Sequence, residues 1–150
     1  MVHEVISRSG SCLIVDCHSF PSVALPYEVD QTEQRADFCV GTDPFHTPSP
    51  IRDAIVAAAN DLGYSITVDA PFSGALVPLA FYRKNHRVRS VMIEVNRRMY
   101  MDENSGLKNR EFEQVRGAVG QLIETAAEAA ARDLHGHLSP PPDRLPGERG

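Results

Sequence analysis

The hydrophobic positions of the chain fall into short runs that predict strands. Residues 12–15 are continuously apolar, which is typical of a strand buried on both faces. Residues 37–40 predict a second short strand that stops at Gly41. Residues 64–68 and 90–95 predict two more strands, and the last is interrupted by one acidic residue.

Between these runs, apolar residues spaced by three and four positions predict two helices. Ser49 can cap the first, Pro50 suits its first helical position, and Gly63 can end it in a left-handed conformation. The second helix is expected to start at Lys108 or Asn109. The apolar stripes comprise Ile51, Ile55, Ala58 and Leu62 in the first helix, and Phe112, Val115, Val119, Ile123 and Ala126 in the second. This alternation predicts an α/β fold with a mainly parallel sheet flanked by helices.

Composition fits one globular domain, which we place at residues 1–133 of the 150-residue chain. Residues 134–150 end in a stretch rich in proline and glycine, and we expect this tail to be disordered. The net charge of −5 and the absence of a basic stripe argue against nucleic acid. No apolar run approaches the ~20 residues that span a bilayer, and no signal peptide is evident. The odd set of three cysteines favours reduced thiols and a cytoplasmic location.

A candidate metal ligand lies at the expected carboxyl end of the first strand, in the segment Asp16-Cys17-His18-Ser19. Sites in α/β sheets gather beyond the carboxyl ends of strands. His18 could present a ring nitrogen to a metal there, while Asp16 fixes its tautomer. From the local sequence alone, His18 could equally be simply hydrogen-bonded, and Asp16 could cap a turn.

Glu94 is the acidic residue within the late apolar strand. A buried isolated carboxylate is costly, so it must find a partner, take up a proton or face a cleft. Strand alternation groups the side chains as Met92, Glu94 and Asn96 on one face, and Val91, Ile93 and Val95 on the other. Two plainer interpretations remain open: an edge strand with Glu94 in water, or a salt bridge to Arg87, Arg89 or Arg97.

A metal would give Glu94 a catalytic task. A carboxylate beside the metal can take a proton from an activated water and pass it to a leaving amine. Arg97 is the nearest candidate for neutralising the developing oxyanion, and a surface charge is the plainer interpretation of this residue. Two loop segments, Gly41-Thr42-Asp43 and Ser73-Gly74, could bind substrate through backbone N–H groups or a hydroxyl, or could be ordinary turns.

Taken together, four segments resemble the N-formylglutamate amidohydrolase family. The segments are LIVDCHSFPS (13–22), DFCVGTD (37–43), APFSG (70–74) and MIEVNRRMYM (92–101). The resemblance implies a fold similar to the zinc carboxypeptidases (phosphorylase/hydrolase-like), with a mixed sheet between helices and one catalytic zinc. It implies that His18 is a zinc ligand and Glu94 the general base acting on metal-bound water. Beside these two residues, we expect Asp16, Ser19, Thr42, Asp43, Ser73, Gly74 and Asn96 to bind substrate or support the site.

The chain also departs from this family. Members are roughly twice as long, and their first two zinc ligands precede any segment found here, so the chain resembles the C-terminal half, truncated at the N-terminus. A catalytic zinc usually needs three protein ligands, and His18 supplies one. The isolated chain would therefore bind zinc poorly unless a missing N-terminal half or a homodimer completes it.

Three functions are consistent with these observations. The first is zinc-dependent hydrolysis of a small N-acyl amino acid such as N-formylglutamate, with no nucleic-acid or membrane partner. The second is a non-catalytic remnant or interaction module that keeps the fold without the chemistry. The third is another metal-dependent peptidase or amidase, because one fold can host several reactions.

Overall fold

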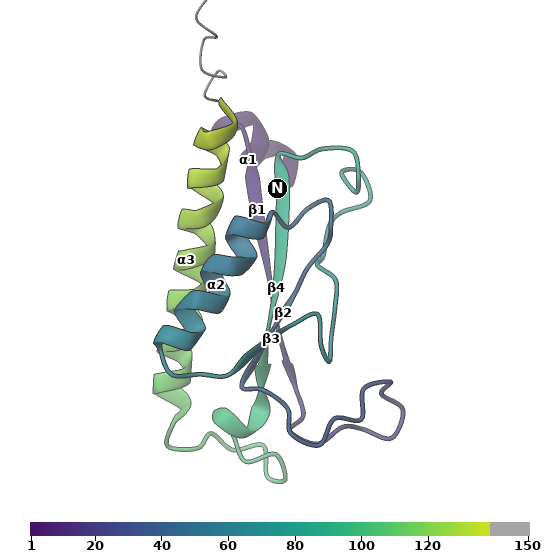
Figure 1. Ribbon diagram of the computed structural model, residues 1–150, viewed down its shortest axis with the longest axis vertical. Helices are drawn as coiled ribbons and strands as arrows, with labels where there is room; N and C mark the ends of the chain where they lie inside the picture. The colour runs from purple at the N-terminus through teal and green to yellow at the C-terminus, as the bar shows by residue number, and fades with distance from the viewer. Residues whose placement is uncertain (139–150) are drawn as a thin grey trace, which may run out of the picture.

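A four-stranded mixed sheet in the order β1-β4-β2-β3 forms the centre of the structure (Figure 1), a computed structural model that describes residues 1–138. The strands are β1 (Cys12–Phe20), β2 (Phe38–Gly41), β3 (Ile66–Val68) and β4 (Val88–Asn96). β1 runs parallel to β4, and β2 runs parallel to β3, but β2 and β4 are antiparallel. The predicted α/β class is confirmed, and two of the three strand pairs are parallel.

The described residues also form three α-helices and one 3-10 helix: α1 (Val2–Ser9), α2 (Ser49–Asp61), η1 (Arg97–Met99) and α3 (Phe112–Leu138). The predicted cap of α2 is wrong by one residue, because Pro48 is the N-cap and Ser49 already lies in the helix. Gly63 has the expected left-handed backbone, with φ of 83°. α3 starts later than expected because the Asn109 side chain accepts a hydrogen bond from the Glu111 N–H at 3.0 Å, within the turn that precedes the helix.

β1 extends well beyond the apolar run that predicted it. Its ladder with β4 continues through Asp16, Cys17 and His18 to Phe20. These polar residues fit within the strand because β1 is an edge strand, where part of each side chain can reach water. His18 therefore lies inside a strand and not in the loop that follows it.

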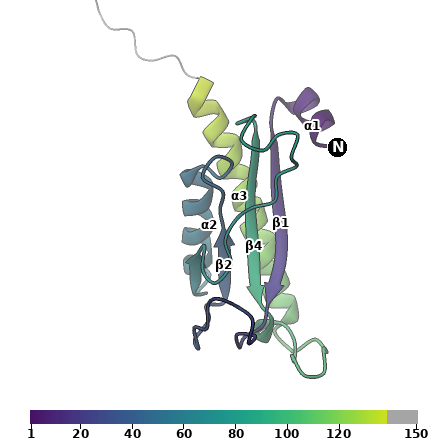
Figure 2. The ribbon, with the colours of Figure 1, turned by 90° about the vertical axis from the view of Figure 1, so that its right-hand side faces the viewer.

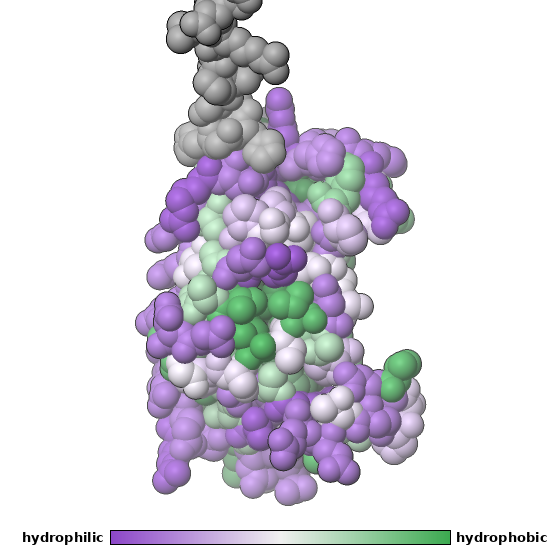
Figure 3. Space-filling view, in the orientation of Figure 1, coloured by the Kyte–Doolittle hydropathy of each residue, from purple (hydrophilic) through white to green (hydrophobic). Residues whose placement is uncertain are grey.

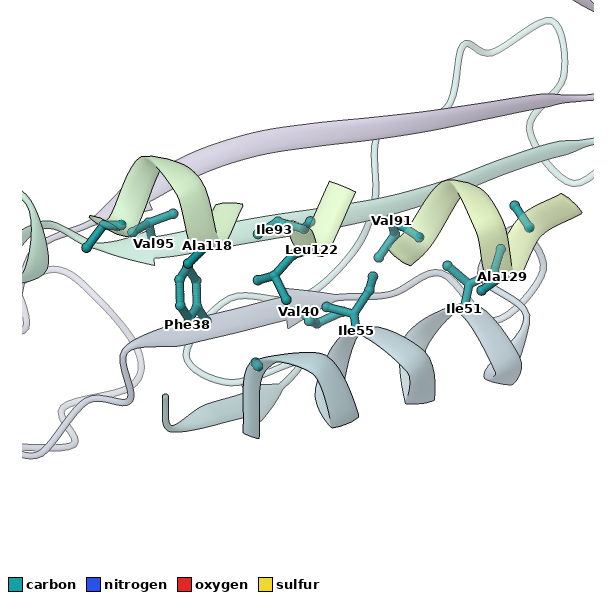
Figure 4. Close-up of a cluster of buried hydrophobic side chains, with 14 residues drawn as sticks. Phe38, Val40, Ile51, Ile55, Val91, Ile93, Val95, Ala118, Leu122 and Ala129 are labelled. Atoms are coloured by element: carbon teal, nitrogen blue, oxygen red, sulfur yellow. The ribbon is translucent and has the colours of Figure 1, made fainter. Parts of the chain in front are cut away.

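One face of the sheet is packed against α2 and α3 and forms the hydrophobic core (Figure 4). Val91, Ile93 and Val95 of β4 lie in this cluster, as strand alternation predicted. Ile51 and Ile55 of α2 are fully buried, whereas Leu62 at the end of the predicted stripe is 38% exposed. Burying each large aliphatic side chain stabilises the fold by about 1.5–3 kcal/mol, so this layer fixes the position of β4.

The opposite face of the sheet is covered by the chain segment between β3 and β4 rather than by a helix (Figure 2). The Ser90 hydroxyl donates to the Leu76 carbonyl at 2.7 Å, and the Cys39 thiol donates to the Phe72 carbonyl at 3.3 Å. A Cβ on Gly41 would lie 2.4 Å from the Gly74 carbonyl oxygen. The glycine at position 41 therefore allows this segment to pack directly on β2.

The surface seen in the orientation of Figure 1 is mostly hydrophilic, with a compact hydrophobic patch at its centre (Figure 3). Within residues 1–138, no helix is long and apolar enough to cross a membrane. α3 continues to Leu138, five residues beyond the domain boundary expected from the sequence. The rest of the predicted disordered tail, residues 139–150, lies outside the described residues.

Candidate active site

His18 and Glu94 lie side by side on neighbouring strands. They are register partners in the parallel β1–β4 pair, so their side chains project to the same face of the sheet. This is the face opposite α2 and α3, because Ile93 and Val95 on either side of Glu94 belong to the helix-covered core. The two residues that the sequence singled out therefore converge on one site.

Asp16 orients the His18 ring. Nε2 of His18 is 2.9 Å from Oδ1 of Asp16, which lies two residues earlier on the same face of β1. With the Nε2 proton directed at Asp16, the lone pair remains on Nδ1, where a metal could be bound. The His18 side chain is 51% exposed and that of Asp16 is 24% exposed, so the pair is open to solvent on one side.

Glu94 is buried, in contrast to its neighbour. β4 is a central strand, so the interpretation of Glu94 as a water-exposed residue on an edge strand is wrong. The residue is 7% exposed, and its Oε2 has no hydrogen-bond partner among the described residues. Burial raises the pKa of the Glu94 carboxyl, the Asp16 carboxylate also raises it, and His18 and Arg97 lower it. A carboxylate with a raised pKa and an unpaired oxygen is well suited to accept a proton.

Arg97 lies at the carboxyl end of β4, in the first turn of η1. Its Nε donates to the Ser19 hydroxyl and its Nη2 to the Ser19 carbonyl, both at 3.2 Å. These contacts tie the end of β4 to the end of β1 and hold the guanidinium close enough to lower the pKa of Glu94. Ser19 therefore positions Arg97 at the edge of the site.

Asn96 shares the Glu94 face, but its side chain has a local structural task. It donates to the Ala36 carbonyl at 3.1 Å and accepts from the Arg98 N–H at 3.3 Å. Asn96 thus caps η1 and anchors the loop that precedes β2. Asn96 therefore supports the site indirectly, by fixing the end of the strand that carries Glu94.

Thr42 and Asp43 are not brought to the His18–Glu94 pair. They follow β2, and because β2 is antiparallel to β4, its carboxyl end lies toward the amino end of β4. The Thr42 hydroxyl donates to Asp69 at 2.6 Å, and Asp43 accepts from the N–H groups of Phe45 and His46. Their contacts are those of a turn.

Ser73 and Gly74 belong to the segment that covers the Glu94 face. Gly74 packs on Gly41, whose register partner is Met92, two residues before Glu94. Gly74 has a φ of 94°, which favours glycine. Ser73 is exposed, so its hydroxyl is available to a ligand approaching this face.

Two neighbours of the site were not recognised from the sequence. Cys39 is the register partner of Glu94 on β2, and its fully buried thiol forms one wall beside the carboxylate. Arg35 is buried between the Phe20 and Phe72 rings, 5.9 and 5.8 Å from their centroids, and forms an ion pair with Glu28. A lone arginine in a loop gives no signal of this role, because the two rings that enclose it come from separate segments of the chain.

The side chains of this site are of types that bind zinc, but there are too few of them to hold the ion. Imidazole and carboxylate are ordinary zinc ligands, and the unpaired Oε2 of Glu94 suits a proton acceptor next to a metal. Across residues 1–138, however, no three His, Cys, Asp or Glu side chains are arranged to hold a metal ion. A zinc bound at His18 would need ligands beyond those of one described chain.

Comparison with known proteins agrees with this class of fold and site. The sequence profile of the N-formylglutamate amidohydrolase family matches residues 1–101. The chain therefore belongs to the N-formylglutamate amidohydrolase family. No curated protein matches it.

One solved structure shows the same fold. The chain resembles the N-formylglutamate amidohydrolase of Ralstonia eutropha with a TM-score of 0.70 and 21% identity, over 90% of this chain and 49% of that one. A gene product of Agrobacterium tumefaciens aligns with a TM-score of 0.49 and 21% identity, over 87% of this chain and 48% of that one. The chain thus spans about half the length of these solved proteins.

Proposed function

We propose that the chain contributes part of the active site of an amidohydrolase that cleaves an N-acyl amino acid such as N-formylglutamate. The observation that carries this proposal is the buried carboxyl of Glu94, whose Oε2 has no partner within residues 1–138, beside the half-exposed imidazole of His18. Family membership supports the reaction class.

In this mechanism Glu94 is the general base. Its Oε2 takes a proton from the attacking water as the water oxygen bonds to the acyl carbon, and the C–N bond then breaks as the proton passes to the leaving amine. The products are the free amino acid and formate. Because burial raises the pKa of the Glu94 carboxyl, this group accepts the proton of the water more readily than an exposed glutamate would.

His18 would hold a zinc ion through Nδ1, with Asp16 as the residue that positions its ring. When bound, such an ion polarises the amide carbonyl and makes water more acidic. Arg97, held by Ser19, supplies positive charge for the developing oxyanion. Ser73 and Gly74 contribute the wall that faces the substrate.

A second candidate function has an observation of its own. The described chain holds no group of three metal-binding side chains, which favours a non-catalytic remnant or interaction module. Another metal-dependent peptidase or amidase would use the same His18 and Glu94 roles on a different amide.

The test measures formate release from N-formylglutamate together with zinc content by elemental analysis. We expect Glu94→Gln to retain the wild-type zinc content and lose turnover by about 10²–10⁴-fold. His18→Ala should lose both zinc and turnover, while Glu124→Gln, an exposed carboxylate on α3, should change neither. Undiminished activity in Glu94→Gln would refute the mechanism. A folded, metal-free chain that is inactive on all N-acyl amino acids tested would support the remnant.

A further inference from the structure

The Phe72 side chain crosses the face of the sheet that carries Glu94. The Phe72 carbonyl accepts a hydrogen bond from the Cys39 thiol at 3.3 Å, and Cys39 is the register partner of Glu94 on β2. The centre of the Phe72 ring lies 5.8 Å from that of the Phe20 ring. Phe20 belongs to β1 and is the register partner of Asn96, two residues after Glu94. Since β4 lies between β2 and β1, Phe72 spans β4 at the level of Glu94.

The backbone around Phe72 is fixed to β2, but the ring extends away from it. The Asp69 N–H donates to the Val40 carbonyl at 2.8 Å, and the hydrogen bond between Cys39 and Phe72 follows three residues later. From this backbone the ring projects toward β1, where it meets the Arg35 guanidinium. The position of the ring over β4 therefore depends on the contacts that it makes there.

Arg35 provides the charged part of these contacts. Its guanidinium carbon lies 5.8 Å from the centre of the Phe72 ring and 5.9 Å from that of Phe20, within the range of a cation–π interaction. The Arg35 side chain is 1% exposed, and Glu28, with which it forms an ion pair, is 10% exposed. Cation–π interactions are stronger when they are shielded from water. Arg35 is thus well suited to hold the Phe72 ring in one place.

Arg35 is itself held from two sides. Its Nη1 donates to the Pro21 carbonyl at 3.2 Å, and its Nη2 donates to the Asp30 carbonyl at 3.0 Å. The Arg35 carbonyl accepts a hydrogen bond from Nη2 of Arg98, in η1 directly after β4, at 3.3 Å. Arg35 therefore links the Phe72 ring to the loop between β1 and β2 and to the end of β4.

We propose that the Phe72 ring closes the Glu94 site toward the carboxyl end of β4, and that Arg35 is the positioning residue that keeps the ring closed. Phe72 is itself only partly buried, so an outward movement of its ring leads into solvent. Cys39 and Glu94 beneath it are 0% and 7% exposed. Release of the ring should therefore open both of these side chains to solvent.

The consequence for substrate choice rests on the proposed function. In that reaction Glu94 acts on the water that attacks the acyl carbon, so the acyl group is the part of the substrate nearest to Phe72. A formyl group fits beside the closed ring, whereas a longer acyl chain needs the space that the ring fills. Phe72 thereby selects substrates with a small acyl group.

The closure is tested without substrate or metal, by the rate at which a maleimide labels Cys39 in the folded full chain. Labelled peptides are assigned by mass spectrometry. Arg35→Met combined with Glu28→Gln removes both members of the ion pair, so that no buried charge is left without its partner. We expect Cys39 to react about 10-fold faster or more in this double variant, because the cation–π interaction is lost. Cys12, which is buried at the opposite end of β1 from Phe20, should react at the wild-type rate.

The comparison of the two thiols separates local opening from a general loss of stability, since unfolding exposes both of them. Phe72→Ala should accelerate the labelling of Cys39 alone, and Arg35→Lys, which keeps the positive charge, should accelerate it less than the double variant does. Arg132→Met is the control, because it removes an exposed arginine of α3. A wild-type rate at Cys39 in Phe72→Ala or in the double variant overturns the proposal, and so does equal acceleration of Cys12 and Cys39.

The size limit is measured as kcat/KM for N-acetylglutamate relative to that for N-formylglutamate. Phe72→Ala should raise this ratio by about 10-fold or more, the discrimination usual for one methylene group. An unchanged ratio in a variant that still cleaves N-formylglutamate overturns the size limit. A wild-type chain without turnover on either compound contradicts the proposed function, whereas the closure is decided by the thiol labelling alone.

Discussion

On one face of the sheet, α2 and α3 bury Val91 and Ile93 fully. The other face leaves His18 half exposed beside a buried Glu94, whose Oε2 has no hydrogen-bond partner among residues 1–138. The same strand, β4, contributes to both faces. The helix-covered face satisfies its hydrophobic side chains with contacts from the chain itself. The other face shields the Glu94 carboxyl from water and leaves its Oε2 without a partner in the described part of the chain. This arrangement does not stabilise the fold and is typical of a functional site. The difference separates the residues that hold the fold from those that carry the chemistry.

The largest effect is expected on the helix-covered face. Leu122 of α3 is fully buried in the core cluster, and Leu122→Ala should lower the free energy of unfolding by about 2–5 kcal/mol, since it leaves a cavity. Urea denaturation measures this change. Leu107→Ala is the control, because Leu107 is 70% exposed and its truncation should change stability by less than about 0.5 kcal/mol. Equal effects of the two substitutions would contradict the assignment of the core.

A smaller loss of stability is expected on the face that carries His18 and Glu94, which residues 69–87, between β3 and β4, cover. Gly41→Ala places a Cβ 2.4 Å from both the Gly74 carbonyl oxygen and Cε of Met92, and should destabilise the fold by about 1–3 kcal/mol. Gly117→Ala in α3 meets no atom within 4 Å and should instead stabilise by up to about 1 kcal/mol. Thermal unfolding of both variants measures the contrast. Tolerance of Gly41→Ala would show that the segment does not pack on β2 as described.

The division between the two faces could be predicted from the sequence, because strand alternation is a local property. The pattern around Glu94 correctly placed Val91, Ile93 and Val95 in the core. The sequence did not predict α1, which makes no side-chain cap hydrogen bond and buries no residue. Nor did it predict the full length of β1, since its polar second half is a strand only because β4 pairs with it.

The arrangement of the candidate site depended on strand order, which local patterns do not contain. Thr42 and Asp43 follow a strand, so they were expected at the edge of the sheet that carries His18. The antiparallel β2–β4 pair instead places the carboxyl end of β2 toward the amino end of β4. His18 and Glu94 were expected to lie together, and they do, as register partners; that they form an active site, and their roles in it, remain predictions that the variants above test.

The smallest effect, and the sharpest contrast between the two faces, is expected from the stability of Glu94→Gln as a function of pH. Burial raises the pKa of Glu94 in the folded state, so the folded chain binds this proton more tightly than the unfolded chain does. Below the ordinary glutamate pKa of about 4.3 the group is protonated in both states and carries no penalty. As the pH rises through the raised pKa, the folded state must either keep its proton or bury a charge, and stability falls. Glutamine cannot ionise, so Glu94→Gln should match the wild type near pH 4 and exceed its free energy of unfolding by roughly 1–2 kcal/mol at neutral pH. Urea titrations at both pH values measure the difference, with Glu124→Gln as the exposed control. If Glu94→Gln is less stable than the wild type at neutral pH, the Glu94 carboxylate has a hydrogen-bond or ion-pair partner in solution. The two faces of β4 would then not differ in the way described.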